Sequence, residues 1–499
     1  MRSSIVSFLV LLLSASSFAQ VELLDRIEID YKDEFYVKGL YNFGEHGVVL
    51  SAVEDVRKSR RDPKRMYVFY DKDLIELESF EVDVPFRRKI SATYEGEKQL
   101  HTFYYDKRNG EFNIVTIDSR NTSRIEYEGE IAKKQFINQF KVIGKTAVLY
   151  TSTKRDKFLH IIDLETSTVK KVPFKKIRRS NSIYVIDIQC LPGEEEITVL
   201  FQEYQKKIML STSLYVINKD GEVSDAIRVN AGNWNIVDGT PTRLENGELI
   251  IAGTYSQMKS TGAAGMFVCS FTEGEQNYFN IYDFNEFDNF FEYLSDRAKK
   301  KLEKKKKRKA RRGKELQVNV RMAIHNVEER DGQLYLLGEA YYPTYRTESY
   351  TTYVNGRPTT QYRTVFDGYQ YTHAVLSVFD MDGEKLEDHT FKMWLSYKPM
   401  YVRRNIELNV DDDIVKMVVV DGTVLRTKIL DQGDVVDTET VNLVSETAGD
   451  RIRYASIGTV EFFYDNSFIS YGKQVIKNKQ NKKVKKKRNV FYMQKILIE

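Results

Sequence analysis

This chain of 499 residues contains only two cysteines and eight prolines. Two cysteines are too few to build a disulfide scaffold. We expect Cys190 and Cys269 to remain unbridged, because they fall on predicted strands that lie too far apart for a bond. No apolar run beyond the first twenty residues approaches the roughly 18 residues of a membrane-spanning helix. The sequence therefore indicates neither a disulfide-rich fold nor a helical membrane protein.

Signatures of catalysis and of metal binding are also missing. The six histidines show neither HExxH nor any other metal-binding spacing, and G-x-S-x-G does not occur. The segment DMDGE (380–384) resembles part of a calcium loop but lacks the further ligands, so an Asp-Gly turn between strands explains it. The sequence therefore predicts no catalytic residue, no metal site and no cofactor.

The first nineteen residues have the three zones of a secretory signal peptide. Arg2 is positive, residues 5–13 are almost entirely apolar, and Ser17-Phe18-Ala19 fits the small-x-small rule for cleavage. We expect a mature protein, 20–499, that is exported to a periplasm or to the extracellular space. We expect it to form a single domain.

Aromatic residues are abundant, with 32 tyrosines and 28 phenylalanines, and period-two stretches recur, which favours an all-β protein. Apolar strand-like segments return about every fifty residues once two insertions, 286–316 and 343–372, are removed. The residues that mark the start of these segments are Gly47, Lys98, Lys145, Glu196, Glu248, Gln333, Asp413 and Ser467. This spacing indicates one repeated supersecondary unit.

Each unit contains four short strands. The second is the clearest, with RKISATYE, KQLHTFYYD, EFNIVTIDS and SRIEYEGE following one another over 88–130. Such a repeat resembles the blades of β-propeller proteins in architecture, although no WD dipeptide, kelch double glycine or Asp-box is present. The resemblance implies eight four-stranded blades, or seven if one unit is misread. The alternative is two or three unrelated β domains.

The last unit has only three strands before the chain ends, and a spare strand precedes the first unit. We therefore expect 22–30 to pair beside 490–498 and to close the ring, which would remove its open edge.

The two insertions have different characters. In 286–316 the residues Phe287, Phe290, Phe291 and Leu294 follow a helical spacing, and Gly313 is a plausible stop. We expect two docked helical turns followed by a mobile basic projection. Alternation on either side of Asn355-Gly356 in 343–372 predicts a Tyr-rich hairpin that either protrudes or packs over its own blade.

Positive charge is concentrated in two segments. Residues 297–314 hold thirteen Lys or Arg and one acid, and 473–488 hold nine Lys or Arg and no acid. In an antiparallel blade the second-to-third turns and the blade-to-blade links lie at one end. These loops are mostly basic and the opposite loops mostly acidic, so we expect a propeller with one basic and one acidic end.

This layout suggests an exported binding or scaffold protein that holds a polyanion on a basic, Tyr-bearing face. The expected partner is an acidic glycan, an anionic lipid surface or an acidic protein, and not a nucleic acid. The alternative is a hydrolase or lyase that acts on an acidic polysaccharide in the propeller funnel. The candidate ligand-binding residues are Arg57, Lys58, Arg60, Arg61, Lys154, Arg155, Lys175, Lys176, Arg178, Arg179, Lys304, Lys305, Lys306, Lys307, Arg308, Tyr345, Tyr350, Tyr353 and Tyr362.

Overall fold

The computed structural model of the chain describes most of the sequence after residue 20. The described ranges are 21–30, 35–54, 63–83, 89–154, 156–174, 182–191, 196–206, 208–257, 262–445, 447–455, 458–480 and 486–499. The predicted signal peptide lies outside them.

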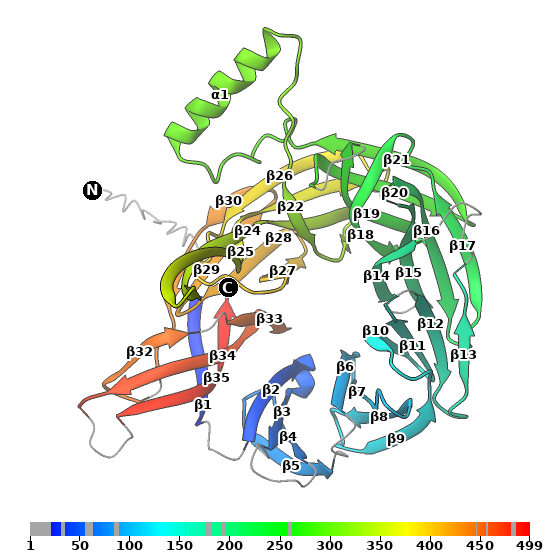
Figure 1. Ribbon diagram of the computed structural model, residues 1–499, viewed down its shortest axis with the longest axis vertical. Coiled ribbons are helices and arrows are strands. Elements are labelled where there is room, and N and C mark those ends of the chain that lie inside the picture. Colours follow the sequence, from blue (N-terminus) through cyan, green and yellow to red (C-terminus); the bar gives the residue numbers. More distant parts are fainter. Residues whose placement is uncertain are drawn as a thin grey trace, which may run out of the picture.

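The described strands form eight antiparallel sheets arranged as the blades of a propeller (Figure 1). Blade 1 consists of β2 (Phe35–Asn42), β3 (Val48–Glu54), β4 (Lys64–Tyr70) and β5 (Glu76–Asp83), with the short helix η1 (Gly44–His46) after β2. Blade 2 consists of β6 (Lys89–Glu95), β7 (Gln99–Tyr105), β8 (Glu111–Asp118) and β9 (Arg124–Glu130). Blade 3 consists of β10 (Phe136–Ile143), β11 (Thr146–Ser152), β12 (Lys157–Asp163) and β13 (Val169–Val172). Blade 4 consists of β14 (Ser182–Leu191), β15 (Glu196–Gln205), β16 (Ile208–Asn218) and β17 (Val223–Val229).

The remaining four blades include the irregular ones. Blade 5 consists of β18 (Trp234–Arg243), β19 (Leu249–Gln257), β20 (Gly265–Thr272) and β21 (Glu275–Asp283). Blade 6 consists of β22 (Arg321–Ile324), β23 (Glu328–Arg330), β24 (Gln333–Val354), β25 (Arg357–Asp380) and β26 (Lys385–Lys392). Blade 7 consists of β27 (Ile406–Asp411), β28 (Ile414–Asp421), β29 (Val424–Asp431), β30 (Asp434–Asp437) and β31 (Thr440–Asn442). Blade 8 consists of β32 (Asp450–Ala455), β33 (Thr459–Tyr464), β34 (Ser467–Asn478), β35 (Lys487–Ile498) and β1 (Val21–Asp30).

The blade count and the repeat period are confirmed. Every predicted marker lies within one residue of the start of the second main strand of its blade, from Val48 of β3 to Ser467 of β34. The count is eight, so the seven-blade alternative is wrong. Cys190 on β14 and Cys269 on β20 are both unbridged, as expected.

The predicted closure is confirmed as well. β1 is the outer strand of blade 8 and pairs antiparallel with β35, from Glu22 opposite Leu497 to Asp30 opposite Val490. The first described strand of the chain thereby completes the sheet that the last strand leaves unfinished.

Within the described ranges the hydrophobic core consists of eight clusters, one between each pair of neighbouring blades. The cluster between blades 8 and 1, for example, joins Phe491 and Met493 to Leu50 and Val68. Since each blade buries both of its faces, its second strand is apolar on both sides, and Val148, Leu149 and their neighbours in β11 are fully buried.

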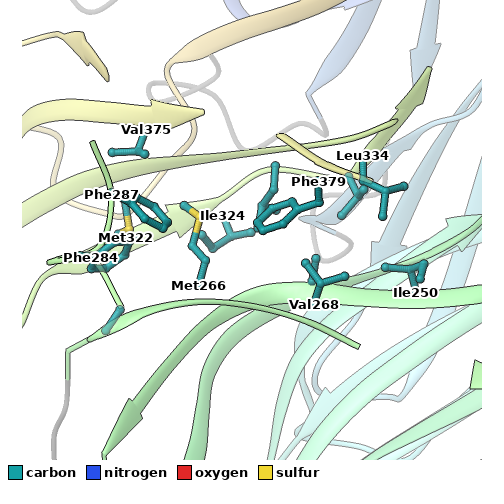
Figure 2. Close-up of a cluster of buried hydrophobic side chains, with 14 of the residues drawn as sticks. Ile250, Met266, Val268, Phe284, Phe287, Met322, Ile324, Leu334, Val375 and Phe379 are labelled. Atoms are coloured by element: carbon teal, nitrogen blue, oxygen red, sulfur yellow. The ribbon is translucent and has the colours of Figure 1, made fainter. Parts of the chain in front are cut away.

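The link between blades 5 and 6 adds to one of these clusters. Phe284 and Phe287 lie beside Met266 of blade 5 and Met322 of blade 6 (Figure 2), and Phe290 is also fully buried there. The predicted docking of this insertion is therefore correct.

The predicted helical position is wrong, however. Residues 284–294 form turns, and helix α1 (Asp296–Ala310) begins after them, over the basic run itself. Lys, Arg, Ala and Leu are all strong helix formers, and this outweighs the repulsion between like charges. The helix ends near Gly313, whose φ of 62° and whose N–H bond to Ala310 O fit the predicted stop.

Helix α1 stands outside the ring of blades (Figure 1). It buries no side chain and contacts its own anchor, through a Lys299–Glu292 ion pair of 2.7 Å and through Lys306 over the ring of Phe291. In the described part of the chain, no helix is both long and apolar enough to cross a membrane.

The Tyr-rich insertion is a continuation of β24 and β25, which pair from Gln333–Asp380 to Val354–Arg357. The turn between them is Asn355-Gly356, with φ values of 51° and 73°, as the sequence predicts. Beyond Tyr345 most of the described side chains are exposed, so the hairpin protrudes from blade 6.

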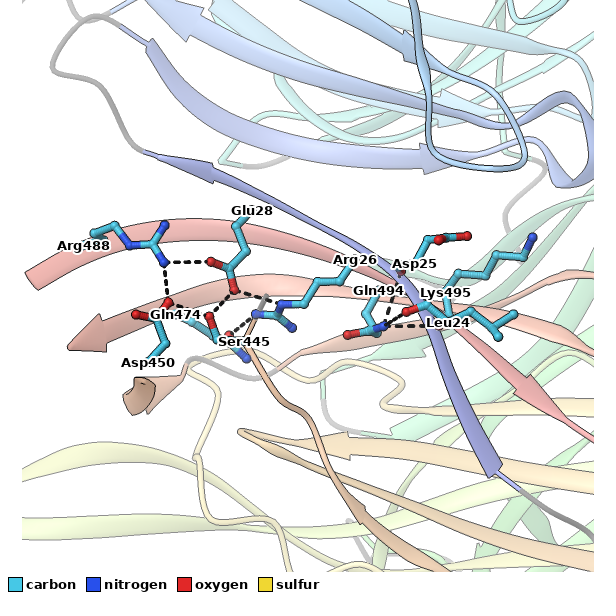
Figure 3. A network of polar contacts seen from close by, with 10 residues as sticks. All are labelled: Leu24, Asp25, Arg26, Glu28, Ser445, Asp450, Gln474, Arg488, Gln494 and Lys495. Carbon is cyan, nitrogen blue, oxygen red and sulfur yellow. Dashed lines mark hydrogen bonds and ion pairs between the residues drawn. The ribbon is translucent and has the colours of Figure 1, made fainter. Parts of the chain in front are cut away.

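Ring closure is held by a buried polar network as well as by strand pairing (Figure 3). Glu28 of β1 accepts from Arg26 at 2.9 Å and from Arg488 of β35 at 3.1 Å, and Arg488 also pairs with Asp450 of β32. Arg26 Nη2 donates to Gln474 of β34 at 2.8 Å. The network therefore joins the N-terminal strand to three other strands of blade 8.

Replacement of Glu28 by Ala should destabilise the closed ring strongly, because Arg26 and Arg488 would remain buried without their shared carboxylate. We expect a loss of about 3–5 kcal/mol in the free energy of unfolding, measured by chemical denaturation. Glu76→Ala, at an exposed position of β5, is the control and should change little. An equal effect of both substitutions would contradict the role of the network.

Replacement of 297–314 by a short Gly-Ser linker should leave the fold intact, because α1 buries no side chain. We expect the melting temperature to fall by less than about 5 °C. Phe290→Ala, in contrast, should cost about 3–5 kcal/mol, since this ring is fully buried. A larger loss from the linker than from Phe290→Ala would show that the helix is part of the core.

Candidate functional site

The first strands of successive blades meet around the centre of the ring. From blade 2 to blade 6 each first strand contacts the next one: β6 contacts β10, β10 contacts β14, β14 contacts β18, and β18 contacts β22. In the rest of the ring, β27 of blade 7 contacts β23 of blade 6 and β33 of blade 8. Residues of these strands line two cavities described below.

The larger cavity, which we call the aspartate pocket, has a volume of about 570 Å³. It lies between β14, β18, β22 and the link from blade 6 to blade 7. Its lining residues are Tyr184, Ile186, Asp187, Val237, Asp238, Gly239, Thr240, Arg321, Met322, Ala323, Ile324, Tyr341, Val402, Arg403 and Arg404. Paired acids, arginines and aromatic rings therefore share one concave surface.

Asp187 and Asp238 occupy equivalent positions in blades 4 and 5. Each follows a β-bulge in the first strand of its blade, and each accepts a hydrogen bond from the next residue's N–H, at 2.9 and 3.0 Å. Bulges redirect a side chain locally. Burial raises the pKa of Asp238 to about 6, and the charge of Asp187 adds to this shift. Asp238 therefore keeps its proton to a higher pH than an exposed aspartate would.

The arginines of the pocket are held differently. Arg404 donates to Ile324 O at 2.8 Å and to Asn326 Oδ1 at 3.0 Å, so its guanidinium is fixed against blade 6. Arg321 is exposed, and among the described residues its guanidinium has neither a hydrogen-bond partner nor an ion-pair partner. The pocket thus contains one guanidinium that is free to bind an anion.

A fully buried carboxylate positions the link that carries Arg403 and Arg404. Glu339 accepts hydrogen bonds from the backbone N–H groups of Asn405 and Ile406, at 2.6 and 2.8 Å, and from His325 Nε2, at 2.8 Å. Because all these donors converge on one side chain, the link is fixed to blade 6.

Aromatic rings extend from the aspartate pocket into the hairpin. Tyr341 packs edge-on against Tyr369 at 5.3 Å, Tyr369 against Phe366 at 5.0 Å, and Phe366 against Tyr345 at 6.0 Å, measured between ring centroids. Tyr184 forms another wall of the pocket and is 54% exposed. The pocket and the hairpin therefore share a continuous row of rings.

The smaller cavity, which we call the glutamate cavity, has a volume of about 340 Å³ and is lined partly by Glu328, Glu407 and Glu461. Arg404 lines both cavities and so lies between them. Burial raises the pKa of Glu328 to about 7 and that of Glu407 to about 8, and repulsion from Glu461 contributes to the shift of Glu407.

Hydrogen bonds hold two of these glutamates in place. Phe462 N donates to Glu407 at 3.0 Å, and the hydroxyl of Tyr471 donates to Glu461 at 2.5 Å. In the described part of the chain, no three His, Cys, Asp or Glu side chains are grouped so as to hold a metal ion.

The structure places only part of the predicted ligand-binding set. Lys154 is exposed in the second-to-third turn of blade 3, and Lys304, Lys305, Lys306, Lys307 and Arg308 lie on α1, outside the ring. The hairpin carries Tyr345, Tyr350, Tyr353 and Tyr362, all exposed. The predicted residues outside the described ranges are Arg57, Lys58, Arg60, Arg61, Arg155, Lys175, Lys176, Arg178 and Arg179.

Sequence reasoning missed the aspartate pocket. An alignment of the repeats with one another would have indicated it, because Asp187 and Asp238 stand 51 residues apart at the same position of their repeats. The corresponding residue after the bulge is Gly39, Ala92 or Gln139 in blades 1 to 3, so a carboxylate at this position distinguishes two neighbouring blades.

The eight sheets and their closure by β1 define an eight-bladed β-propeller. No family model and no curated protein sequence matches the chain. Among solved structures it is similar to the polysaccharide lyase Uly1, with 10% identity, a TM-score of 0.40, and coverage of 82% of this chain and 90% of that one.

Two other solved structures that resemble the chain are propeller domains. The β-propeller domain of the Trilobed protease from Pyrococcus furiosus has 9% identity and a TM-score of 0.35, over 81% of this chain and 93% of that one. The WD40 domain of SCAP from fission yeast has 8% identity and a TM-score of 0.38, over 95% and 98%. At these values the likeness concerns architecture alone.

The glutamate cavity should make stability depend on pH. Because the folded-state pKa of Glu407 is raised from about 4.5 to about 8, the folded protein holds a proton that the unfolded chain has lost. Stability should therefore fall as pH rises from about 4.5 to about 8. Glu407→Gln removes this titrating group, so the melting temperature of the variant should fall less with rising pH than that of the wild type. Thermal melts from pH 5 to 8.5 would measure the difference. The exposed Glu76→Gln is the control, and a decline identical in Glu407→Gln and wild type would disprove the assignment.

Proposed function

We propose that this protein is an exported glycan-binding protein whose aspartate pocket takes an acidic sugar unit. The single observation that carries the proposal is the position of Arg321. This exposed guanidinium has no ion-pair partner among the described residues, and it lines the same cavity as Asp187, Tyr184 and Tyr341.

Each class of side chain in the pocket matches a different part of an acidic sugar. A guanidinium binds a carboxylate or sulfate through parallel N–H donors, and carboxylate oxygens such as those of Asp187 accept from sugar hydroxyls. Tyrosine offers a flat apolar face together with a hydroxyl. A volume of about 570 Å³ suits a ligand of one or two sugar rings.

The exposed cations elsewhere on the propeller support a polyanionic rather than a neutral ligand. Lys154 and the lysines of α1 would attract such a chain from solution without fixing its position. Because exposed charges are screened beyond a Debye length of about 8 Å at physiological salt, this attraction should weaken steeply as salt increases. The pocket would select the ligand, and the outer cations would increase the rate at which the ligand meets the protein.

One observation favours a second function, cleavage of the bound glycan. Asp238 has a raised pKa, of about 6, beside Asp187. Pairs of acids whose proton affinities are pushed apart serve as acid and base in many enzymes. In this function Asp238 would donate a proton to the departing sugar oxygen as the glycosidic bond breaks, while Asp187 would take a proton from a water molecule whose oxygen bonds to the anomeric carbon.

Calorimetric titration of the full-length protein with galacturonate, and with galactose as the neutral counterpart, tests the proposal. We expect galacturonate to bind more tightly, and Arg321→Gln to weaken it about tenfold or more because one charge-assisted hydrogen-bonding group is lost. Arg228→Gln, at an exposed arginine of β17 outside the pocket, is the matched control and should bind galacturonate like the wild type.

Equal binding of the acidic and neutral sugars, or insensitivity to Arg321→Gln, would contradict the proposal. Release of shortened chains from polyuronates by the wild type, lost in the near-isosteric Asp238→Asn, would establish the second function. Binding without any release would exclude it.

A further inference from the structure

The protruding part of the β24–β25 hairpin has two chemically different faces. Residues directly opposite each other in an antiparallel pair point to the same side. The pairing therefore assigns every side chain beyond Tyr345 to one face or the other.

The first face, which we call the aromatic face, carries no charged residue. The cross-strand pairs that contain an aromatic ring are Tyr345 with Phe366, Ser349 with Tyr362, and Tyr353 with Pro358. Between them lie two threonine pairs, Thr347 with Thr364 and Thr351 with Thr360. Tyr345, Tyr353 and Tyr362 are 62%, 75% and 72% exposed, so their rings are open to solvent.

The opposite face is closed by its own contacts. Glu348 bonds Arg346 at 2.7 Å and Arg363 at 2.9 Å, Tyr350 donates to Gln361 at 2.9 Å, and Arg363 lies over the Tyr350 ring. These contacts pair the polar groups of Arg346, Glu348, Tyr350, Gln361 and Arg363 with one another. Tyr350 therefore differs in role from the other three hairpin tyrosines.

The three exposed rings of the aromatic face are evenly spaced. Tyr345, the Ser349–Tyr362 pair and Tyr353 follow one another at intervals of four residues. At about 3.4 Å per residue, each interval is about 14 Å and the row is about 27 Å long. A small molecule does not span this distance, whereas an extended polymer does.

The row is continuous with the aspartate pocket. Tyr345 contacts Phe366, Phe366 contacts Tyr369, and Tyr369 contacts Tyr341, which lines that pocket. We propose that a glycan chain, seated by one acidic unit in the aspartate pocket, continues along the aromatic face of the hairpin and stacks sugar rings on Tyr345, Tyr362 and Tyr353. This inference rests on the proposed function and deepens it.

The chemistry of the face favours a glycan over other polymers. A nucleic acid would need cations for its phosphates, and the aromatic face has none. A protein partner would need about 800 Å² on each side, whereas a two-stranded ribbon about 27 Å long and about 10 Å wide offers roughly 300 Å². Aromatic rings alternating with hydroxyls suit the apolar faces and hydroxyl groups of sugar rings.

The test compares single galacturonate with long homogalacturonan oligomers, using titration of full-length variants. Combined replacement of Tyr345, Tyr353 and Tyr362 by Ala should weaken binding of the long oligomers about tenfold or more, as expected for the loss of three stacking rings. Binding of single galacturonate should not change. Tyr350→Ala, an exposed tyrosine on the opposite face of the same hairpin, is the matched control and should bind both ligands like the wild type.

The outcomes separate the two proposals. Unchanged binding of long oligomers in the triple variant, an equal loss in Tyr350→Ala, or no binding of long oligomers by the wild type would overturn the inference. Binding of long oligomers that depends on the three tyrosines but not on Arg321 would overturn the pocket proposal and leave the hairpin surface standing. Melting temperatures equal to that of the wild type would confirm that the exposed substitutions leave the fold intact.

Discussion

The pairing of β1 with β35 is the constraint on which the rest of the structure depends. Each blade buries both faces against its neighbours, so no blade has a core of its own. A ring open at blade 8 would leave the edge of β35 exposed and would leave the inter-blade clusters on either side of it less well enclosed. The ion pair between Glu28 of β1 and Arg488 of β35 forms only when these two strands meet.

Closure also explains why polar chemistry gathers at the centre. Second strands such as β11 are buried on both faces because they lie between blades, whereas first strands such as β18 and β27 also line the two cavities. Polar residues on these strands, such as Asp238, Glu407 and Glu461, are enclosed by the ring without belonging to its core. Enclosure without full pairing raises the pKa of each carboxyl. The same geometry therefore builds a closed ring and two cavities lined by carboxyls whose pKa values are raised.

The sequence predicted those features that depend on local pattern. Strand period gave the eight blades, a missing strand gave the closure, and Asn355-Gly356 gave the hairpin. The sequence pattern placed the helix too early in the chain. The spacing of Phe287, Phe290 and Phe291 suits a helix, but it also suits turns that dock the same rings into the core. The aspartate pocket was not predicted, because it depends on the bulges of β14 and β18 and on how blades from distant segments meet. A single sequence shows the aspartates but not the backbone shift that turns them inward.

The terminal strands have a consequence for the order in which the protein folds. Val21 pairs with Ile498, so the first described residues wait for almost the entire chain to be synthesised before they find their partner. At about 5–20 residues per second, this delay is roughly 25–100 s. During that time the edge of the nascent sheets is unprotected, and contacts of such long sequence separation form slowly. Closure of the ring therefore requires the two ends of the chain to meet, and a factor that bound β1 beforehand would delay it.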